Sequence, residues 1–308
     1  MCRPPRLVFV SSYHIPAGLT RKRAEKRANC PLSTAQKLCY TDGNPFREER
    51  ATMRIVIKVG TSTLTHATGK LNIRRVELLC KVMSDLKNAG HELVLVSSGA
   101  IAMGVGKMNM TRKPTDIPSK QALAAIGQCE LMYIYDKLFS EYHHTVAQVL
   151  LTGSDVEDPQ RHLNFQNTMF KLLEMGALPV INENDTVATA EIAVGDNDTL
   201  GAIVATNIRA DLLILMSDIE GLYTADPRHD PEAKLIPLVE AITPDILALA
   251  GGTDNELGTG GMVTKLRAAK MCMDAGCDMI ITNGTRPNDL YRIADGEDVG
   301  TRFKGGRA

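Results

Sequence analysis

The sequence predicts an α/β fold in which helices cover both faces of a mainly parallel central sheet. Short, continuously apolar segments such as Leu93–Val96 alternate with segments whose apolar residues recur at helical spacing. Several of the apolar segments end abruptly in small or polar residues, as Ala177–Ile181 does. Buried strands with polar loops at their carboxyl ends are typical of a layered helix–sheet–helix protein with a ligand at one sheet edge.

The elements follow in order from Met53. A strand at 55–59 leads into the small-residue turn Gly60–Thr63, and a helix follows over 76–86. The remaining elements are a strand at 93–96, a helix at 123–138, a strand at 146–151, a helix at 165–175, a strand at 177–181, a helix from 200, a strand at 212–216, mixed structure at 237–249, a helix at 262–275 and a last strand at 279–281.

The composition narrows the class of protein. Of the 308 residues, 44% are hydrophobic, which is ample for a large core. Lys+Arg 35 against Asp+Glu 36 gives a net charge of -1, so there is no basic excess to attract nucleic acid or a membrane surface. No apolar run approaches the roughly 20 residues that span a bilayer. We therefore expect a soluble, cytoplasmic protein.

The cysteines give no sign of a disulfide framework. There are seven of them, an odd number, and they form no CxxC pair. This spacing favours reduced, buried thiols over disulfides or a metal site. No metal-ligating residues are predicted.

Residues 1–52 differ in composition from the rest of the chain. The first 40 carry many basic residues against the single acid Glu25, and they show no hydrophobic periodicity. We expect a disordered or artefactual leader. A transit peptide, which would place the protein in mitochondria, stays open as the alternative because such peptides are basic and poor in acids. Residues 53–308 are expected to form one domain.

Two polar clusters stand close to the end of the strand at 177–181. Asn182–Asp185 follows the strand directly, and Asp196–Asp198 precedes an apolar helical pattern. Carboxylates and amides in this arrangement suit a substrate with an ammonium group, or a metal shared with phosphates. Either cluster alone also fits a turn or a helix N-cap. The two together favour a binding site.

Two lysines are placed to meet an anion. Lys58 lies inside an apolar strand, where a buried ammonium group needs a partner; a lysine that reaches the surface is the alternative. Gly258–Lys265 is glycine-rich and opens a helix, whose free amide groups suit phosphate, although its spacing is not that of a P-loop. Together, Lys58 and Lys265 predict a phosphate clamp.

These segments resemble the glutamate 5-kinases of the amino acid kinase superfamily. The likeness covers about 53–303 and rests on KVGTS, SSGAIAMG, INENDTVATAEI, VGDND, GLYTADPR and GTGGMVTK. The resemblance implies the amino acid kinase fold and ATP-dependent phosphorylation of the γ-carboxylate of L-glutamate, the first step of proline biosynthesis. It also implies Mg²⁺ carried with the nucleotide, a homo-oligomer, feedback inhibition by proline as an open question, and a separate glutamyl-phosphate reductase downstream.

The resemblance assigns roles position by position. Lys58 and Lys265 would neutralise the transferring phosphoryl group, and Asp198 would orient the site as a third catalytic residue. The glutamate-binding residues would be Ser98, Asp185 and Asn197. The nucleotide- and phosphate-binding residues would be Lys58, Gly60, Ser217, Asp218, Thr259, Gly260, Gly261, Met262, Val263, Thr264 and Lys265.

Elementary chemistry agrees with that activity. A carboxylate with a reference pKa of about 4.3 is already ionised at neutral pH, so its phosphorylation needs no general base. The reaction needs in-line positioning and neutralisation of phosphate charge. The sequence accordingly offers no obvious catalytic histidine, and His143 and His144 are expected to be structural.

Two other interpretations stay open. A kinase of acetylglutamate or a similar acid would need apolar space for an acyl group, whereas Asp185, Asp196 and Asp198 favour a free ammonium group. A non-catalytic amino-acid sensor would be favoured by loss of either lysine, and both are present. Because the chain stops at Ala308, we expect neither a C-terminal PUA domain nor a fused reductase.

Overall fold

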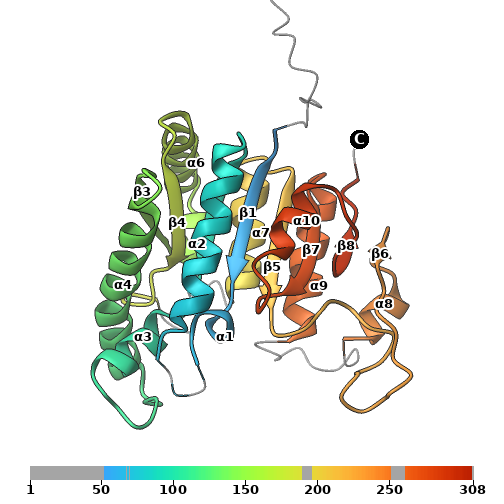
Figure 1. The fold of residues 1–308 in the computed structure, drawn as a ribbon, viewed down its shortest axis with the longest axis horizontal. Coiled ribbons are helices and arrows are strands. Elements are labelled where there is room, and N and C mark those ends of the chain that lie inside the picture. The colour runs from blue at the N-terminus through green and yellow to red at the C-terminus, as the bar shows by residue number, and fades with distance from the viewer. Residues whose placement is uncertain (1–51, 67, 69, 189–195, 251–260, 307–308) are drawn as a thin grey trace, which may run out of the picture. The chain divides into compact units, whose positions relative to one another are not determined.

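A mainly parallel sheet runs through the centre of the molecule, with helices on both faces (Figure 1). The structure is a computed structural model that describes residues 52–66, 68, 70–188, 196–250 and 261–306. The strands follow the order β3-β4-β2-β1-β5-β7-β8-β6, in which β7 and β8 pair in antiparallel fashion. Their bounds are β1 Arg54–Val59, β2 Glu92–Ser97, β3 Val146–Leu151, β4 Leu178–Glu183, β5 Leu212–Ser217, β6 Leu238–Val239, β7 Asp278–Asn283 and β8 Thr301–Phe303.

Two layers of helices sandwich this sheet. In the described residues the helices are α1 Thr61–Leu64, α2 Ile73–Asn88, α3 Ala100–Lys107, α4 Ile117–Ser140, α5 Gly153–Glu157, α6 Pro159–Glu174, α7 Asn197–Asn207, α8 Pro244–Ala248, α9 Met262–Asp274 and α10 Asp289–Ala294. One layer contains α2, α4 and α10, and the other contains α6, α7 and α9. The predicted helix–sheet–helix arrangement is confirmed.

Alternation along β1 decides which layer each side chain meets. Ile55, Ile57 and Val59 pack with the layer of α2, α4 and α10, and Val56 packs with the opposite layer. Side chains on a strand alternate between its two faces. Lys58 therefore lies on the same face as Val56, beneath α7 and α9.

The structure differs from the sequence prediction in several segments, among them α5 and α10, which were not predicted, and α6, which begins at Pro159 and not at 165. The strand at 279–281 is not the last, because β8 follows it; three residues are too few to show a strand period. A helix, α3, lies between the predicted strand at 93–96 and the predicted helix at 123–138, where no element is predicted; its two glycines lower helix propensity. The long helix α4 begins six residues before the predicted position 123, at Ile117, because Pro118 is tolerated in a first helical turn.

Two glycines allow α3 and α4 to touch backbone to backbone. A Cβ atom on Gly104 would lie 2.1 Å from the carbonyl oxygen of Leu123. One on Gly127 would lie 1.8 Å from the carbonyl oxygen of Ala100. The position of α3 beside the end of β2 thus depends on the absence of two side chains.

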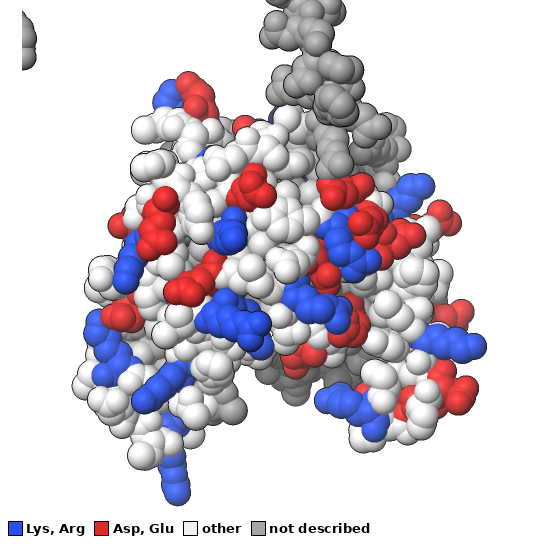
Figure 2. All heavy atoms as spheres, in the orientation of Figure 1, with Lys and Arg blue, Asp and Glu red and all other residues white. Residues whose placement is uncertain are grey.

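The surface carries mixed charge. On the face drawn in Figure 2, basic and acidic side chains are interspersed and neither sign forms a continuous patch. Through the described ranges, no helix combines the length and the apolar character that crossing a membrane requires. The leader predicted for 1–52 lies, up to residue 51, outside the described residues.

Candidate active site

A polar cavity of about 490 Å³ opens where β1, β2 and β4 end and α7 begins. The carboxyl ends of neighbouring parallel strands meet at one sheet edge, which is where such proteins bind ligands. The charged residues that line the cavity are Lys58, Lys113, Asp185, Asp196 and Asp198. The predicted glutamate-binding residues Ser98, Asp185 and Asn197 line it too, so the structure brings them together.

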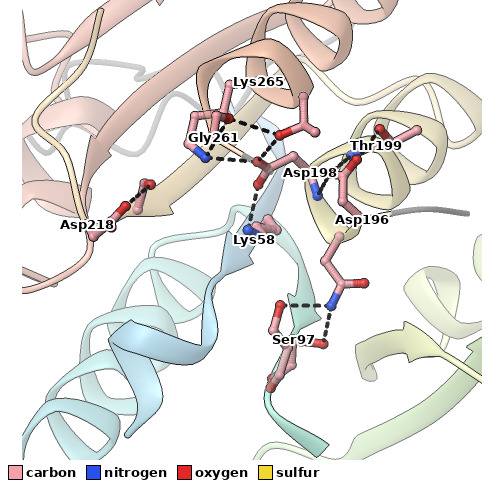
Figure 3. A network of polar contacts seen from close by, with 12 residues as sticks. Lys58, Ser97, Asp196, Asp198, Thr199, Asp218, Gly261 and Lys265 are labelled. Atoms are coloured by element: carbon pink, nitrogen blue, oxygen red, sulfur yellow. Dashed lines mark hydrogen bonds and ion pairs between the residues drawn. The ribbon is translucent and has the colours of Figure 1, made fainter. Parts of the chain in front are cut away.

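Lys58, Asp198 and Lys265 form a buried charged trio in this region (Figure 3). Lys58 Nζ lies 2.5 Å from Asp198 Oδ1, and Lys265 Nζ donates to Asp198 Oδ2 at 3.0 Å. The three side chains come from β1, α7 and α9 and point toward one another. Their residues are 8%, 4% and 7% exposed, so the charges are well shielded from water.

Two ammonium groups and one carboxylate give the trio a net positive charge of one. Burial raises the pKa of the Asp198 carboxyl, but attraction by Lys58 and Lys265 outweighs burial and holds that pKa below its ordinary value. Asp198 is therefore ionised at neutral pH and compensates one of two ammonium groups. A buried excess of positive charge is unfavourable until an anion arrives. The net positive charge of the trio is therefore suited to an anion.

Asp196 has a structural role that explains why Asp198 faces the lysines. It is the N-cap of α7, and its Oδ1 accepts from the amides of Asp198 and Thr199 at 2.7 and 2.9 Å. This contact satisfies amides that a helix leaves free at its first turn. The N-cap interpretation of this acidic cluster is therefore correct for Asp196, although it also lines the cavity.

The start of α9 has no side-chain cap, in contrast to the start of α7. Its N-cap, Gly261, has no side chain to accept from the first amides, and its φ of 86° and ψ of -150° form a conformation that favours glycine. Thr264 Oγ1 instead bonds to Gly261 O and to Asp198 Oδ2 at 3.0 and 3.2 Å. Met262 and Val263 lie in the same first turn. Thr259 and Gly260 lie outside the described residues.

A row of amides forms one wall of the site. Asn197 Nδ2 lies 2.8 Å from Ser98 Oγ and 3.2 Å from Asn182 Oδ1, and it donates to both. Asn182 Nδ2 in turn donates to Gln128 Oε1 at 2.9 Å. Gln128 comes from α4, whose Tyr135 hydroxyl also lies 2.8 Å from Ser97 Oγ. We call Gln128, Asn182, Asn197 and Ser98 the amide relay.

Asp185 and Lys113 occupy the cavity beyond the amide relay. Asp185 follows β4, and Lys113 lies between α3 and α4. Burial raises the pKa of Asp185, and the positive charge of Lys113 partly opposes that rise. The two groups are thus close enough to influence each other.

Three other predicted residues lie at the edges of the site. Gly60 lines the cavity, where a Cβ atom would lie 3.8 Å from Lys58 Nζ. Ser217 ends β5, and its hydroxyl donates to Asp218 Oδ1 at 3.0 Å. Neither Ser217 nor Asp218 lines the cavity, and Figure 3 shows Asp218 apart from the trio. They remain predictions for the nucleotide.

The structure adds residues that sequence reasoning missed. Lys113 lies between two predicted elements, the strand at 93–96 and the helix at 123–138, and Gln128 lies inside a helical pattern where nothing marks it as special. Asn182 belonged to a recognised cluster but received no role. The signal that could have revealed Gln128 is a polar residue on the buried stripe of a helix, next to Gly127.

Comparison with known proteins identifies the family. The model of the amino acid kinase family matches residues 53–283. The chain belongs to this family. A relative named glutamate 5-kinase from Caldanaerobacter subterraneus subsp. tengcongensis is 54% identical over 251 residues, which is 82% of this chain and 68% of the relative. Another relative of that name, from Clostridium perfringens, is 52% identical over 254 residues, 81% of this chain and 94% of the relative.

Solved structures of the amino acid kinase fold resemble the chain as well. A carbamate kinase from Giardia lamblia bound to AMP-PNP gives a TM-score of 0.58 at 17% identity, covering 83% of this chain and 99% of that one. A UMP kinase from Bacillus anthracis gives 0.57 at 17% identity, covering 84% and 98%. At this identity the likeness establishes the shared fold.

Proposed function

We propose that the protein transfers the terminal phosphoryl group of ATP to the γ-carboxylate of L-glutamate, which gives γ-glutamyl phosphate and ADP. The observation that carries the proposal is the convergence of Lys58 and Lys265 on Asp198 beside a polar cavity. The 54% identity to a relative named glutamate 5-kinase supports the choice of acceptor. The reaction is the first step of proline biosynthesis.

The chemical step requires charge and position. A γ-carboxylate oxygen of glutamate attacks the γ-phosphorus of ATP. The bond from that phosphorus to the oxygen it shares with the β-phosphate breaks, and ADP leaves with the electron pair. Because the attacking carboxylate is already ionised, no proton is removed. What the protein supplies is an aligned pair of oxygens and compensation of phosphoryl charge.

The trio is suited to that task. Lys58 and Lys265 approach different oxygens of the Asp198 carboxylate, so two ammonium groups flank one point with their spacing set by Asp198. We place the transferring phosphoryl group against these ammonium groups. Its negative charge would balance the excess positive charge of the trio. Asp198 touches the lysines and acts as their orienting residue.

The open start of α9 supports a place for the nucleotide phosphates. Unpaired amides at a helix N-terminus attract anions, and Gly261 allows a phosphate to approach closely. Gly60 would border the phosphate path from the opposite side. Ser217 and Asp218 would contact the rest of the nucleotide.

Mg²⁺ fits this site only together with the nucleotide. The described residues contain no group of three or more His, Cys, Asp or Glu side chains placed to hold a metal ion. Asp198, the carboxylate nearest the lysines, is already engaged by them. The ion would be held mainly by phosphate oxygens, where it would neutralise charge on the departing ADP.

We place glutamate at the end of the cavity that is formed by Asp185 and the amide relay. Asn197 directs its NH₂ group toward Ser98 and Asn182, which leaves its Oδ1 as an acceptor for a substrate ammonium group. Asp185 supplies a negative charge to the same group. Asp196 and Asp198 are committed to α7 and the lysines, so the preference for a free ammonium group depends on Asp185.

A hydroxylamine-trapping assay tests the proposal. The protein is incubated with ATP, Mg²⁺ and hydroxylamine, which converts an acyl phosphate to a hydroxamate and phosphate. L-Glutamate, N-acetylglutamate and L-aspartate are tested in parallel. We expect hydroxamate and ADP from L-glutamate alone. Hydroxamate from another acid would overturn the substrate, and absence of product from all acids would overturn the activity and favour a sensor.

The remaining expectations belong to the same proposal. We infer a homo-oligomer, a separate glutamyl-phosphate reductase that consumes the product, and a cytoplasmic site of action. Residues 53–308 would be the catalytic domain, and residues 1–52 would be dispensable for turnover. Inhibition by proline would appear as competition with glutamate in the same assay.

A further inference from the structure

Two of the five charged residues that line the cavity have no hydrogen-bond or ion-pair partner within the described part of the chain. Lys58 and Asp198 belong to the buried trio, and Asp196 caps α7. Asp185 and Lys113 remain. Among the described residues, neither of these two side chains takes part in a hydrogen bond or a salt bridge. A charge that lines a cavity and has no partner there is available to a ligand.

The two remaining charges are opposite in sign and line the same cavity. The ammonium group of Lys113 is the charged neighbour that lowers the pKa of Asp185 against the effect of burial. They come from separate segments, Lys113 from the connection between α3 and α4 and Asp185 from the turn after β4. The cavity thus presents one anion and one cation that do not belong to the buried trio.

We propose that Lys113 binds the α-carboxylate of the amino-acid substrate, so that Asp185 and Lys113 together recognise the two charges on its α-carbon. The inference rests on the proposed function. An α-amino acid carries an ammonium and a carboxylate group on one carbon. Asp185 and Lys113 carry the charges opposite to these two groups. The γ-carboxylate then extends along the cavity toward Lys58.

The contact between α3 and α4 supports a binding role for Lys113, which lies on the loop between these two helices. Lys113 is exposed, so water screens its charge. Its loop is nevertheless anchored at both ends, because Gly104 and Gly127 fix α3 against α4 by backbone contact. Pro114 restricts the backbone of the residue before it, which is Lys113 itself. A bound substrate displaces water from the site, which strengthens the attraction between Lys113 and a carboxylate.

Substrate analogues test the proposal without relying on loss of activity alone. 4-Aminobutanoate lacks the α-carboxylate of glutamate, and glutarate lacks the α-ammonium group. Each is measured on the full chain as a substrate and as a competitive inhibitor of L-glutamate phosphorylation, so weak turnover still gives an inhibition constant. The variants are Lys113→Ala and Asp185→Asn. Arg112→Ala is the matched control, since Arg112 is the neighbouring exposed base and does not line the cavity.

The expected pattern separates the two charges. Lys113→Ala raises the KM for L-glutamate about 10- to 100-fold, the range for loss of a hydrogen bond to a charged group. It leaves the inhibition constant of 4-aminobutanoate within about threefold of the wild-type value. Asp185→Asn, in contrast, raises the inhibition constant of 4-aminobutanoate and leaves that of glutarate unchanged. Arg112→Ala changes none of these values by more than about threefold.

Three outcomes would overturn the inference. Lys113→Ala could weaken the binding of L-glutamate and of 4-aminobutanoate by equal factors, which would show that the charge of Lys113 has only a general effect on the site. It could also leave both unchanged, or lower kcat alone. If the wild-type protein forms no hydroxamate from L-glutamate, the proposed function fails as well. If the wild type is active and Lys113→Ala behaves like it, the inference about Lys113 fails by itself.

Discussion

The two ends of the cavity hold their charges in different ways. At the end near α9, Lys58, Asp198 and Lys265 are almost fully buried and bind one another through contacts of 2.5 and 3.0 Å. At the other end, Asp185 is partly buried and Lys113 is exposed, and neither has a side-chain partner among the described residues. One end is assembled before any ligand arrives, and the other is left open.

The difference follows from the task that each end performs. A phosphoryl group in transfer carries charge that must be met by groups already in position, because reorganisation would add to the barrier. Such groups need a partner that holds them in the empty protein, and Asp198 is that partner. Recognition of an amino acid requires charges that are not yet paired.

The largest effect on stability should come from Asp198→Asn. It leaves the ammonium groups of Lys58 and Lys265 buried together without a counter-charge, and removal of one partner from a buried ion pair costs about 3–5 kcal/mol. We expect the free energy of unfolding to fall by that amount in urea denaturation. ATP should restore part of it, because the phosphates supply the missing charge.

Asp274→Asn is the matched control for that experiment. Asp274 pairs with Lys270 on the exposed side of α9, so its loss should change stability by less than about 1 kcal/mol. Equal effects from the two substitutions would show that Asp198 does not hold buried charges in place.

Lys265→Ala should have the largest effect on turnover. It removes one of the two ammonium groups, and loss of one such group typically lowers kcat about 100- to 1,000-fold. The remaining pair of Lys58 and Asp198 is neutral, so the variant should stay folded. Steady-state hydroxamate formation measures kcat, and Lys270→Ala on the exposed face of the same helix should keep its rate.

Gln128→Met should affect glutamate binding through the amide relay. The substitution leaves Asn182 Nδ2 buried without an acceptor, which costs about 1–3 kcal/mol and allows Asn182 to reorient. Asn197 then loses its fixed orientation, and we expect the KM for L-glutamate to rise about 10-fold with the KM for ATP unchanged. Gln128→Glu keeps the acceptor, so the KM should return toward the wild-type value. A KM that rises equally in both variants would contradict the relay.

The two ends should also respond to pH in opposite ways. Because the folded-state pKa of Asp198 is lowered, its stabilising effect is present above the ordinary value of 3.8 and is lost as the pH falls through the lowered pKa. The pKa of Asp185 is raised, so its protonation favours the folded state but removes the charge that binds ammonium. The KM for L-glutamate should therefore rise as acid is added, at a pH above 3.8 and while the trio is still intact. Asp185→Asn should abolish this dependence.

The sequence predicted the scaffold better than the wall of the site. Alternating apolar strands and helical spacing were enough for the three layers, because each pattern is local. Lys58 and the start of α9 were also recognisable, since a charge in a buried strand and a glycine-rich helix start are unusual in themselves. The predicted roles of these residues remain predictions.

The amide relay could not be predicted because its partners are distant in the chain. Gln128 and Asn182 are separated by 54 positions, and Asn197 and Ser98 by 99. Their contact depends on the placement of α4 by Gly104 and Gly127, which a pattern of apolar residues does not reveal. Asp196 shows the opposite problem, because one acidic cluster contains both a helix cap and a member of the trio.

The central claim is that the two ends of the cavity bind different groups, and the dissociation constant of L-glutamate from the Lys265→Ala variant tests it. Calorimetric titration measures it without turnover. If the trio serves the phosphoryl group and the open end serves the amino acid, the variant binds L-glutamate within about threefold of the wild type although its kcat is lost. If the dissociation constant rises by as large a factor as kcat falls, Lys265 binds the amino acid and the division is wrong.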